Sequence, residues 1–147
     1  MSIENGNFFQ GTIEEIDAEF GVSVEVVGIP PVFDEMGEYL FGLAVNELLV
    51  NCCHNRVSGS DEGASRVLID IAEDEIRIID DYEYTDQRIL EERINMLQDR
   101  VRNPQPGTTK DDGKGGKGVL WSANILKGLG MNLDYYVEGN RIVALIS

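Results

Sequence analysis

Two spacings of hydrophobic residues occur along this chain, and each change of spacing marks the boundary of an expected element. In short segments rich in valine and isoleucine, apolar residues alternate with polar ones, which is the period of a β-strand with one buried face. In longer segments they recur three or four positions apart, which is the period of an amphipathic helix. We therefore expect strands at 23–28, 66–72, 75–79, 131–137 and 141–146, and helices at 35–57, 86–101 and 119–127.

Turn residues separate these elements. Pro30 and Pro31 stop the first strand, and Asp34 is placed to cap the long helix that follows. Residues 103–118 contain two prolines and five glycines, so we expect an irregular loop there. The order of elements predicts a single α+β domain over residues 1–147, with the helices covering one face of an antiparallel sheet in a two-layer α/β sandwich.

Composition narrows the classes of function. The chain carries 27 Asp and Glu against 12 Lys and Arg, a net charge of −15, which argues against nucleic acid as a partner because phosphate backbones are held by basic residues. No apolar run approaches the ~20 residues that a membrane-spanning helix needs, so we expect no membrane association. Cys52 and Cys53 are adjacent on a helix and poorly placed to bridge each other, which predicts reduced thiols and a cytoplasmic protein.

All four lysines lie between residues 110 and 127, among glycines. The run Gly113–Gly118 opens the helix at 119–127, and successive glycines let backbone N–H groups approach an anion at a helix N-terminus. A solvated loop is the alternative, because Gly, Lys and Asp are also ordinary loop residues. The run is not a Walker loop, since Gly115 follows Lys114 where that motif requires Ser or Thr.

Glu47 and Asn51 lie one turn apart on the long helix and share a face. A carboxylate and an amide oxygen at this spacing suit Mg²⁺, and a carboxylate beside a bound water can act as a general base. The pair taken alone is more simply a polar stripe facing solvent. Asp80 follows a buried strand, where it is either the polar end of that strand or an acceptor for an amine such as the exocyclic amino group of adenine.

In this order the three features resemble the GHKL ATPases (gyrase, histidine-kinase and MutL type, with the Bergerat fold) over residues 23–147. ELLVNCCHN at 47–55 resembles their N box, IIDD at 78–81 the strand that delivers the adenine-reading Asp, and GGKGVL at 115–120 the glycine box. The ending DYYVEGNRIV at 134–143 is most similar to the small anti-sigma-factor serine kinases. The resemblance implies ATP and Mg²⁺ as cofactors. It implies Glu47 as the catalytic residue, Asn51 as the metal ligand, and Asn51, Asp80, Gly115, Gly116, Lys117 and Gly118 as nucleotide-binding residues.

The sequence departs from that family's pattern at two places. Tyr82 and Tyr84 stand where the adenine box has glycines, and a tyrosine there either stacks on the base or occupies its space. Asn55 stands where the N box usually has a histidine, with His54 one place earlier. Residues 82–118 correspond to the expected lid over the nucleotide, and the helix at 86–101 is either part of that lid or an inserted structural helix. We expect Trp121 to pack in the core.

Three functions remain under consideration. The first is a regulatory domain that binds Mg²⁺-ATP and acts on a protein partner, as an ATP-dependent serine kinase or a slow ATPase. Residues 1–55, with ten acids and no Lys or Arg, are then a docking face for a basic partner. The second is a non-catalytic module of the same fold that sequesters a partner. The third is an α+β domain whose motifs match by chance. A homodimer is among the expected assemblies, and the sequence does not decide it.

Overall fold

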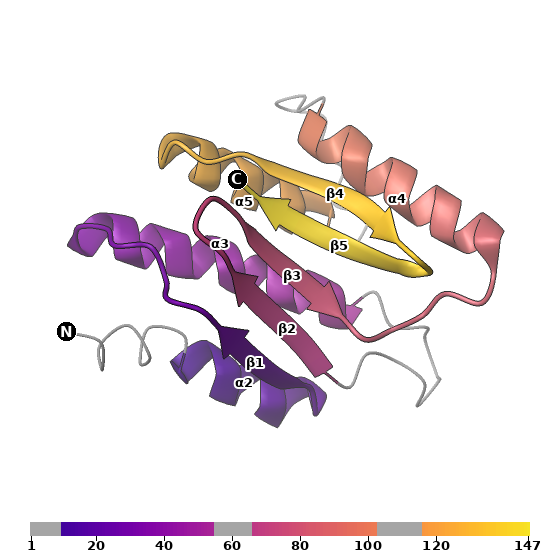
Figure 1. Ribbon diagram of the computed structural model, residues 1–147, viewed down its shortest axis with the longest axis horizontal. Helices are drawn as coiled ribbons and strands as arrows, with labels where there is room; N and C mark the ends of the chain where they lie inside the picture. The colour runs from indigo at the N-terminus through magenta and orange to yellow at the C-terminus, as the bar shows by residue number, and fades with distance from the viewer. Residues whose placement is uncertain (1–9, 55–65, 103–115) are drawn as a thin grey trace.

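The computed structural model describes residues 10–54, 66–102 and 116–147 of the chain, which form two layers, a sheet and a set of helices (Figure 1). The sheet has the strand order β1-β2-β3-β5-β4. Its strands are β1 (Ser23–Val27), β2 (Arg66–Ile71), β3 (Ile76–Asp80), β4 (Leu133–Glu138) and β5 (Arg141–Ile146). The helices are α2 (Gln10–Phe20), α3 (Glu35–His54), α4 (Gln87–Arg102) and α5 (Gly116–Gly128).

The pairing of β1 corrects one expectation. β1 runs parallel to β2, whereas β2–β3, β3–β5 and β4–β5 are antiparallel as predicted. The physical reason is that the long helix α3 separates β1 from β2 in the chain, and a crossover of this kind returns the next strand in the same direction. The predicted two-layer α/β sandwich is confirmed, with a mixed sheet instead of an antiparallel one.

The helix α3 begins where the sequence predicted. Gly37 N–H donates a hydrogen bond to Asp34 Oδ1 at 2.7 Å, so Asp34 caps the helix. Just before this cap, the Phe33 ring packs on Phe41 with their centroids 5.1 Å apart. The helix then runs through the centre of the helical layer, where Leu48 and Leu49 have no exposed surface. Its description ends at His54, so the predicted residues 55–57 lie outside the described part of the chain.

The core lies between the sheet and the helices, and the strands alternate as expected. On the helix-facing side the buried residues are Val67, Ile69 and Ile71 of β2, Ile76 and Ile78 of β3, and Ile142, Ala144 and Ile146 of β5. On the opposite side Arg77 forms an ion pair with Asp70 at 2.7 Å. No helix of the described residues covers this side, which faces the viewer in Figure 1.

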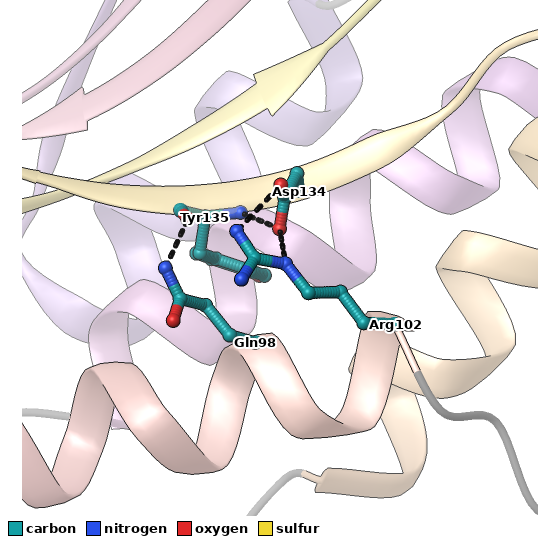
Figure 2. A network of polar contacts seen from close by, with 4 residues as sticks. All are labelled: Gln98, Arg102, Asp134 and Tyr135. Carbon is teal, nitrogen blue, oxygen red and sulfur yellow. Dashed lines mark hydrogen bonds and ion pairs between the residues drawn. The ribbon is translucent and has the colours of Figure 1, made fainter.

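The helix α4 is packed into the domain. Its residues Leu90, Ile94 and Leu97 are buried, and the helix lies against β4 and α5. Figure 2 shows its polar contacts with β4: Gln98 Nε2 donates to the carbonyl oxygen of Tyr135 at 2.9 Å, and Arg102 binds both carboxylate oxygens of Asp134 at 3.0 and 2.9 Å. Of the two interpretations of this helix, an inserted structural helix agrees with its packing.

Two local features differ from the sequence-based expectations. The pattern did not predict α2, a helix rich in acids with a single fully buried residue, Ile16. Trp121 was expected in the core, but its side chain is 46% exposed, because the inner side of α5 is occupied by smaller residues such as Val119 and Leu126. Within residues 10–54, 66–102 and 116–147, no helix is both long and apolar enough to cross a bilayer.

Candidate functional site

Glu47 lies beside the first turns of α5. A Cβ added at Gly118 would come within 2.8 Å of Glu47 Oε2, so the carboxylate packs directly against the backbone of this helix. Only a residue without a side chain leaves room for the carboxylate in its present position. Because α5 begins at Gly116, the carboxylate also lies near the partial positive charge of a helix N-terminus. The fold thus brings together two predicted elements of the site, the acid of the N box and the glycine box.

Asn51, one turn further along α3, is almost completely buried. Its side chain is 5% exposed and is hydrogen-bonded to the phenol of Tyr135 on β4. Burial raises the pKa of Tyr135, and the Asn51 hydrogen bond opposes that rise. Asn51 therefore faces the sheet, which excludes the solvent-facing polar stripe that was the simpler interpretation of the Glu47–Asn51 pair.

Asp80 ends β3 on the helix-facing side of the sheet, opposite Val67 of β2. Its carboxyl group is largely buried, and burial raises its pKa to about 6. Asp81 adds to that rise, while the Tyr82 N–H and Arg141 oppose it. The N–H of Tyr82 donates to Asp80 Oδ1 at 3.0 Å, and this is the only hydrogen bond that the described residues give to the carboxylate. Asp80 is therefore a buried acceptor with capacity left for a further donor.

Two tyrosines fill space next to Asp80. Tyr84 is 7% exposed, and its ring meets that of Tyr82 edge-on, with the centroids 4.8 Å apart. Burial raises the pKa of Tyr84 to about 12; Arg93 opposes this rise, while Asp80, Tyr82 and Cys52 add to it. The buried Tyr84 ring agrees with the alternative that it occupies space near the base, whereas Tyr82 is only partly buried.

A buried polar pair links α3 to the sheet, because the Asn51 side chain is hydrogen-bonded to the Tyr135 phenol on β4. Cys52, the next residue of α3, is only partly buried. Sequence reasoning identified Asn51 but missed Tyr135 as its hydrogen-bond partner. The one available signal was the place of Tyr135 at an inward position of the predicted strand 131–137, which put a phenol in the core.

Parts of the predicted site lie beyond what the structure describes. Gly115 is outside the described residues, and only the backbone of Gly116 and Lys117 is described. Of the predicted lid at 82–118, residues 87–102 form the packed helix α4, and 103–115 are outside the described residues, so the lid stays a prediction.

The described residues offer too few ligands to hold a metal ion without a bound phosphate. In the described ranges, no group of three or more His, Cys, Asp and Glu residues is arranged to hold a metal ion. Mg²⁺ commonly binds through one or two protein oxygens together with substrate phosphates and water. Asn51, the metal ligand that the sequence predicts, would therefore hold Mg²⁺ only together with phosphate and water oxygens.

Solved structures match the chain over nearly its whole length, although no protein-family model and no curated protein matches its sequence. The histidine kinase domain of the blue-light activated histidine kinase of Erythrobacter litoralis EL346 is 17% identical with a TM-score of 0.55, and the match covers 97% of this chain and 58% of that one. The cytoplasmic segment of histidine kinase QseC is 16% identical with a TM-score of 0.58, over 100% and 74% of the two chains. The mycobacterial sensor histidine kinase MprB is 17% identical with a TM-score of 0.57, over 96% and 91%.

The likeness establishes the fold. This chain has the fold of histidine kinase ATPase domains, the Bergerat fold, as the order of its motifs predicted. It spans 58% of the Erythrobacter kinase chain, which is less than two-thirds of that chain's length. A specific relation to the anti-sigma-factor kinases remains a prediction from the sequence.

Proposed function

We propose that this chain binds an adenine nucleotide with Mg²⁺ between α3, the end of β3 and the start of α5, and uses the nucleotide to regulate a protein partner. The observation that carries the proposal is the Asp80 carboxylate, which is largely buried, has a pKa raised to about 6, and receives one hydrogen bond from the described residues. A ligand that donates a hydrogen bond to such a carboxylate stabilises its charged form. The exocyclic amino group of adenine is a donor of this kind.

The other residues of the site fit the phosphates and the metal. The N-terminus of α5 supplies backbone N–H groups for a phosphate, and Glu47 packs against its first turns. An amide carries both donors and an acceptor, so the hydrogen bond between Asn51 and Tyr135 is compatible with a metal bound by the amide oxygen. Bound ATP would supply a transferable phosphoryl group. Glu47 would accept the proton of the attacking water or partner hydroxyl.

Thermal unfolding with and without nucleotide tests the adenine site. Saturating Mg²⁺-ATP should raise the Tm of the wild type, because a ligand that binds only the folded state stabilises it. Asp80→Asn should lose most of that shift, since its amide cannot reproduce the charged acceptor. Asp81→Asn is the matched control, because Asp81 is the adjacent carboxylate and is exposed. An equal shift in Asp80→Asn and the wild type would show that Asp80 does not read the base.

The division of roles between Asn51 and Glu47 needs two further variants. Asn51→Ala should weaken Mg²⁺-dependent binding, but it also breaks the hydrogen bond with Tyr135. Tyr135→Phe removes the same bond from the other side and leaves the amide in place, so it should retain nucleotide affinity. Glu47→Gln should bind nucleotide normally and lose turnover. If Asn51→Ala and Tyr135→Phe lose affinity equally, the amide has only a structural role.

The regulatory part of the proposal predicts little ATPase activity in isolation. With a partner present, we expect either phosphate transfer to a partner serine, as in the anti-sigma-factor kinases that the sequence resembles, or partner binding that depends on ATP. Labelled ATP incubated with the protein and a partner, followed by measurement of phosphoprotein and ADP, separates these two outcomes. Partner-free turnover on the order of 10 per second, as in an ordinary metabolic enzyme, would contradict a regulatory role.

A second candidate is the non-catalytic module that binds a partner without nucleotide. The observation that favours it is Tyr84, which is 7% exposed and packs edge-on against Tyr82, at a position where the family that the sequence resembles has glycine. Under this function, Mg²⁺-ATP leaves the Tm of the wild type unchanged and partner binding is the same with and without nucleotide.

A further inference from the structure

Exposed apolar side chains are concentrated in one short segment of the chain. The described residues contain eight exposed large hydrophobic side chains, and five of them lie between residues 27 and 39. They are Val27 (48% exposed), Ile29 (77%), Val32 (87%), Met36 (64%) and Tyr39 (62%). Apolar side chains scattered singly over a surface need no explanation, but a contiguous group marks an interaction site.

The segment that carries these side chains is anchored to the core. Gly28 has a φ of +101°, and a Cβ at this position would overlap the backbone of Ile71, so the chain passes very close to β2 here. Pro30 is buried, and Phe33 packs on Phe41. The exposed residues between these anchors are therefore presented in a fixed arrangement, which lowers the ordering cost of binding a partner.

An open groove adjoins this segment between α2 and α3. Its volume is about 520 Å³, and its lining includes Gly11, Thr12 and Glu15 of α2 and Glu35, Glu38 and Tyr39 of α3. Met36 and Tyr39 are three residues apart on α3 and so lie on the same side of the helix. Tyr39 lines the groove and Met36 lies beside it on the same helix, so these two side chains and the groove form one surface, which we call the α2–α3 face. One recurring mode of protein recognition lays the apolar face of an amphipathic helix into a groove.

The charge of the α2–α3 face indicates what kind of partner binds there. Residues 10–54 carry nine Asp and Glu and no Lys or Arg, and three of those acids line the groove. A second copy of this chain would bring the same acids to the interface, and like charges brought together oppose association. A partner with Lys and Arg flanking an apolar stripe is attracted by the acids and covers the exposed apolar side chains.

We propose that the α2–α3 face docks a basic amphipathic helix of a partner protein. This goes beyond the proposed nucleotide function and does not depend on it. Met36 and Asn51 are about four turns apart on α3, roughly 22 Å at 1.5 Å per residue, so the docking face and the nucleotide site are separate. Each can fail in experiment while the other holds.

The probe is a fluorescently labelled helical peptide of about 18 residues made of leucine and lysine, titrated with the full chain without nucleotide at ~150 mM salt, where charges further apart than ~8 Å are screened. Met36→Gln combined with Tyr39→Ser should weaken peptide binding by at least about ten-fold, because the apolar anchors are lost. Ile89→Ser removes a comparably exposed apolar side chain from α4, 46% exposed, and should change the affinity by less than about two-fold.

A second matched pair of variants tests how much the acidic side chains contribute to peptide binding. Glu15→Gln, Glu35→Gln and Glu38→Gln together should also weaken binding by at least about ten-fold. The triple variant Glu73→Gln, Asp74→Asn and Glu75→Gln changes the net charge equally, at the exposed β2–β3 turn, and should bind the peptide as the wild type does. All substituted side chains are on the surface, so urea midpoints close to that of the wild type verify that each variant is folded.

Three results would overturn the proposal. Equal losses in the two acidic triple variants would show unspecific charge attraction. Sedimentation that reveals a dimer dissociated by Met36→Gln and Tyr39→Ser would assign the face to a second copy of this chain. Peptide binding that appears only after deletion of residues 1–9 would assign it to the chain's own N-terminal segment.

Discussion

Asp80→Asn should make the protein more stable at neutral pH while it weakens nucleotide binding. The carboxyl group is largely buried, and its pKa is raised from the ordinary value of 3.8 to about 6. The folded state therefore binds this proton more tightly than the unfolded chain does. The resulting stability is fully present below pH 3.8 and is lost as the pH rises through about 6. An amide does not titrate in this range, so Asp80→Asn does not lose this stability as the pH rises.

The size of the effect follows from the two pKa values. The interval between 3.8 and about 6 corresponds to ~3 kcal/mol at ~1.4 kcal/mol for each pH unit. Asp80→Asn should therefore be more stable than the wild type at pH 7 by up to ~3 kcal/mol, and the difference should shrink as the pH falls toward 4. The hydrogen bond from the Tyr82 N–H is retained, because the amide oxygen of the variant accepts it in the same place.

Urea unfolding of the wild type, Asp80→Asn and Asp81→Asn at several values from about pH 4 to pH 8 measures this difference. The many other acids of the chain titrate in all three proteins, so their contributions cancel when the free energies of unfolding are subtracted. A difference between Asp80→Asn and the wild type that is the same at every pH would refute the reasoning. It would mean that the Asp80 carboxylate is as well stabilised in the folded protein as in water.

Three more predictions concern the nucleotide, the turns and α4. Affinity for Mg²⁺-ATP, measured by calorimetry, should fall below about pH 6, because protonated Asp80 is an uncharged and therefore weaker acceptor for the adenine amino group; constant affinity from pH 5 to 8 would contradict it. Gly28→Ala should destabilise the protein by about 1–3 kcal/mol more than Gly139→Ala in urea unfolding, because both glycines have positive φ but only Gly28 lies against another backbone. Leu97→Ala should cost about 2–5 kcal/mol, whereas Arg102→Ala should leave the Tm unchanged, because Arg102 and Asp134 are exposed and water screens their ion pair.

The sequence was sufficient where local patterns decide the structure. The cap at Asp34, the hairpins at 66–80 and 133–146 and the end of α5 follow from turn residues and apolar spacing that act over a few positions. Gly130 illustrates this. Its φ of +81° is readily adopted by glycine, and its N–H donates a hydrogen bond to the Lys127 carbonyl at the end of the helix.

The sequence was insufficient where distant segments decide the environment of a side chain. Asn51 was placed correctly on α3, but its burial depends on Tyr135, which lies on a strand far along the chain. Trp121 was expected in the core, and nothing in the local pattern showed that it lies on the outer side of α5. Tyr84 was recognised as a departure, yet only the fold shows that its ring is buried and meets the ring of Tyr82 edge-on.

The place of β1 at the edge of the sheet has a consequence for the order in which the chain folds. β4 and β5 pair across a short turn, so that Tyr136 meets Val143, whereas β1 reaches its partner only after α3 has crossed, so that Val24 meets Val67. Closing the longer loop costs more chain entropy, and contacts between distant residues form late. We therefore expect the two hairpins to nucleate the domain and β1, with α2 packed on it, to join last and to open first. A partner bound to the α2–α3 face would then stabilise the part of the protein that unfolds most readily. Its binding would be detected as slower native-state hydrogen exchange of the β1 amides.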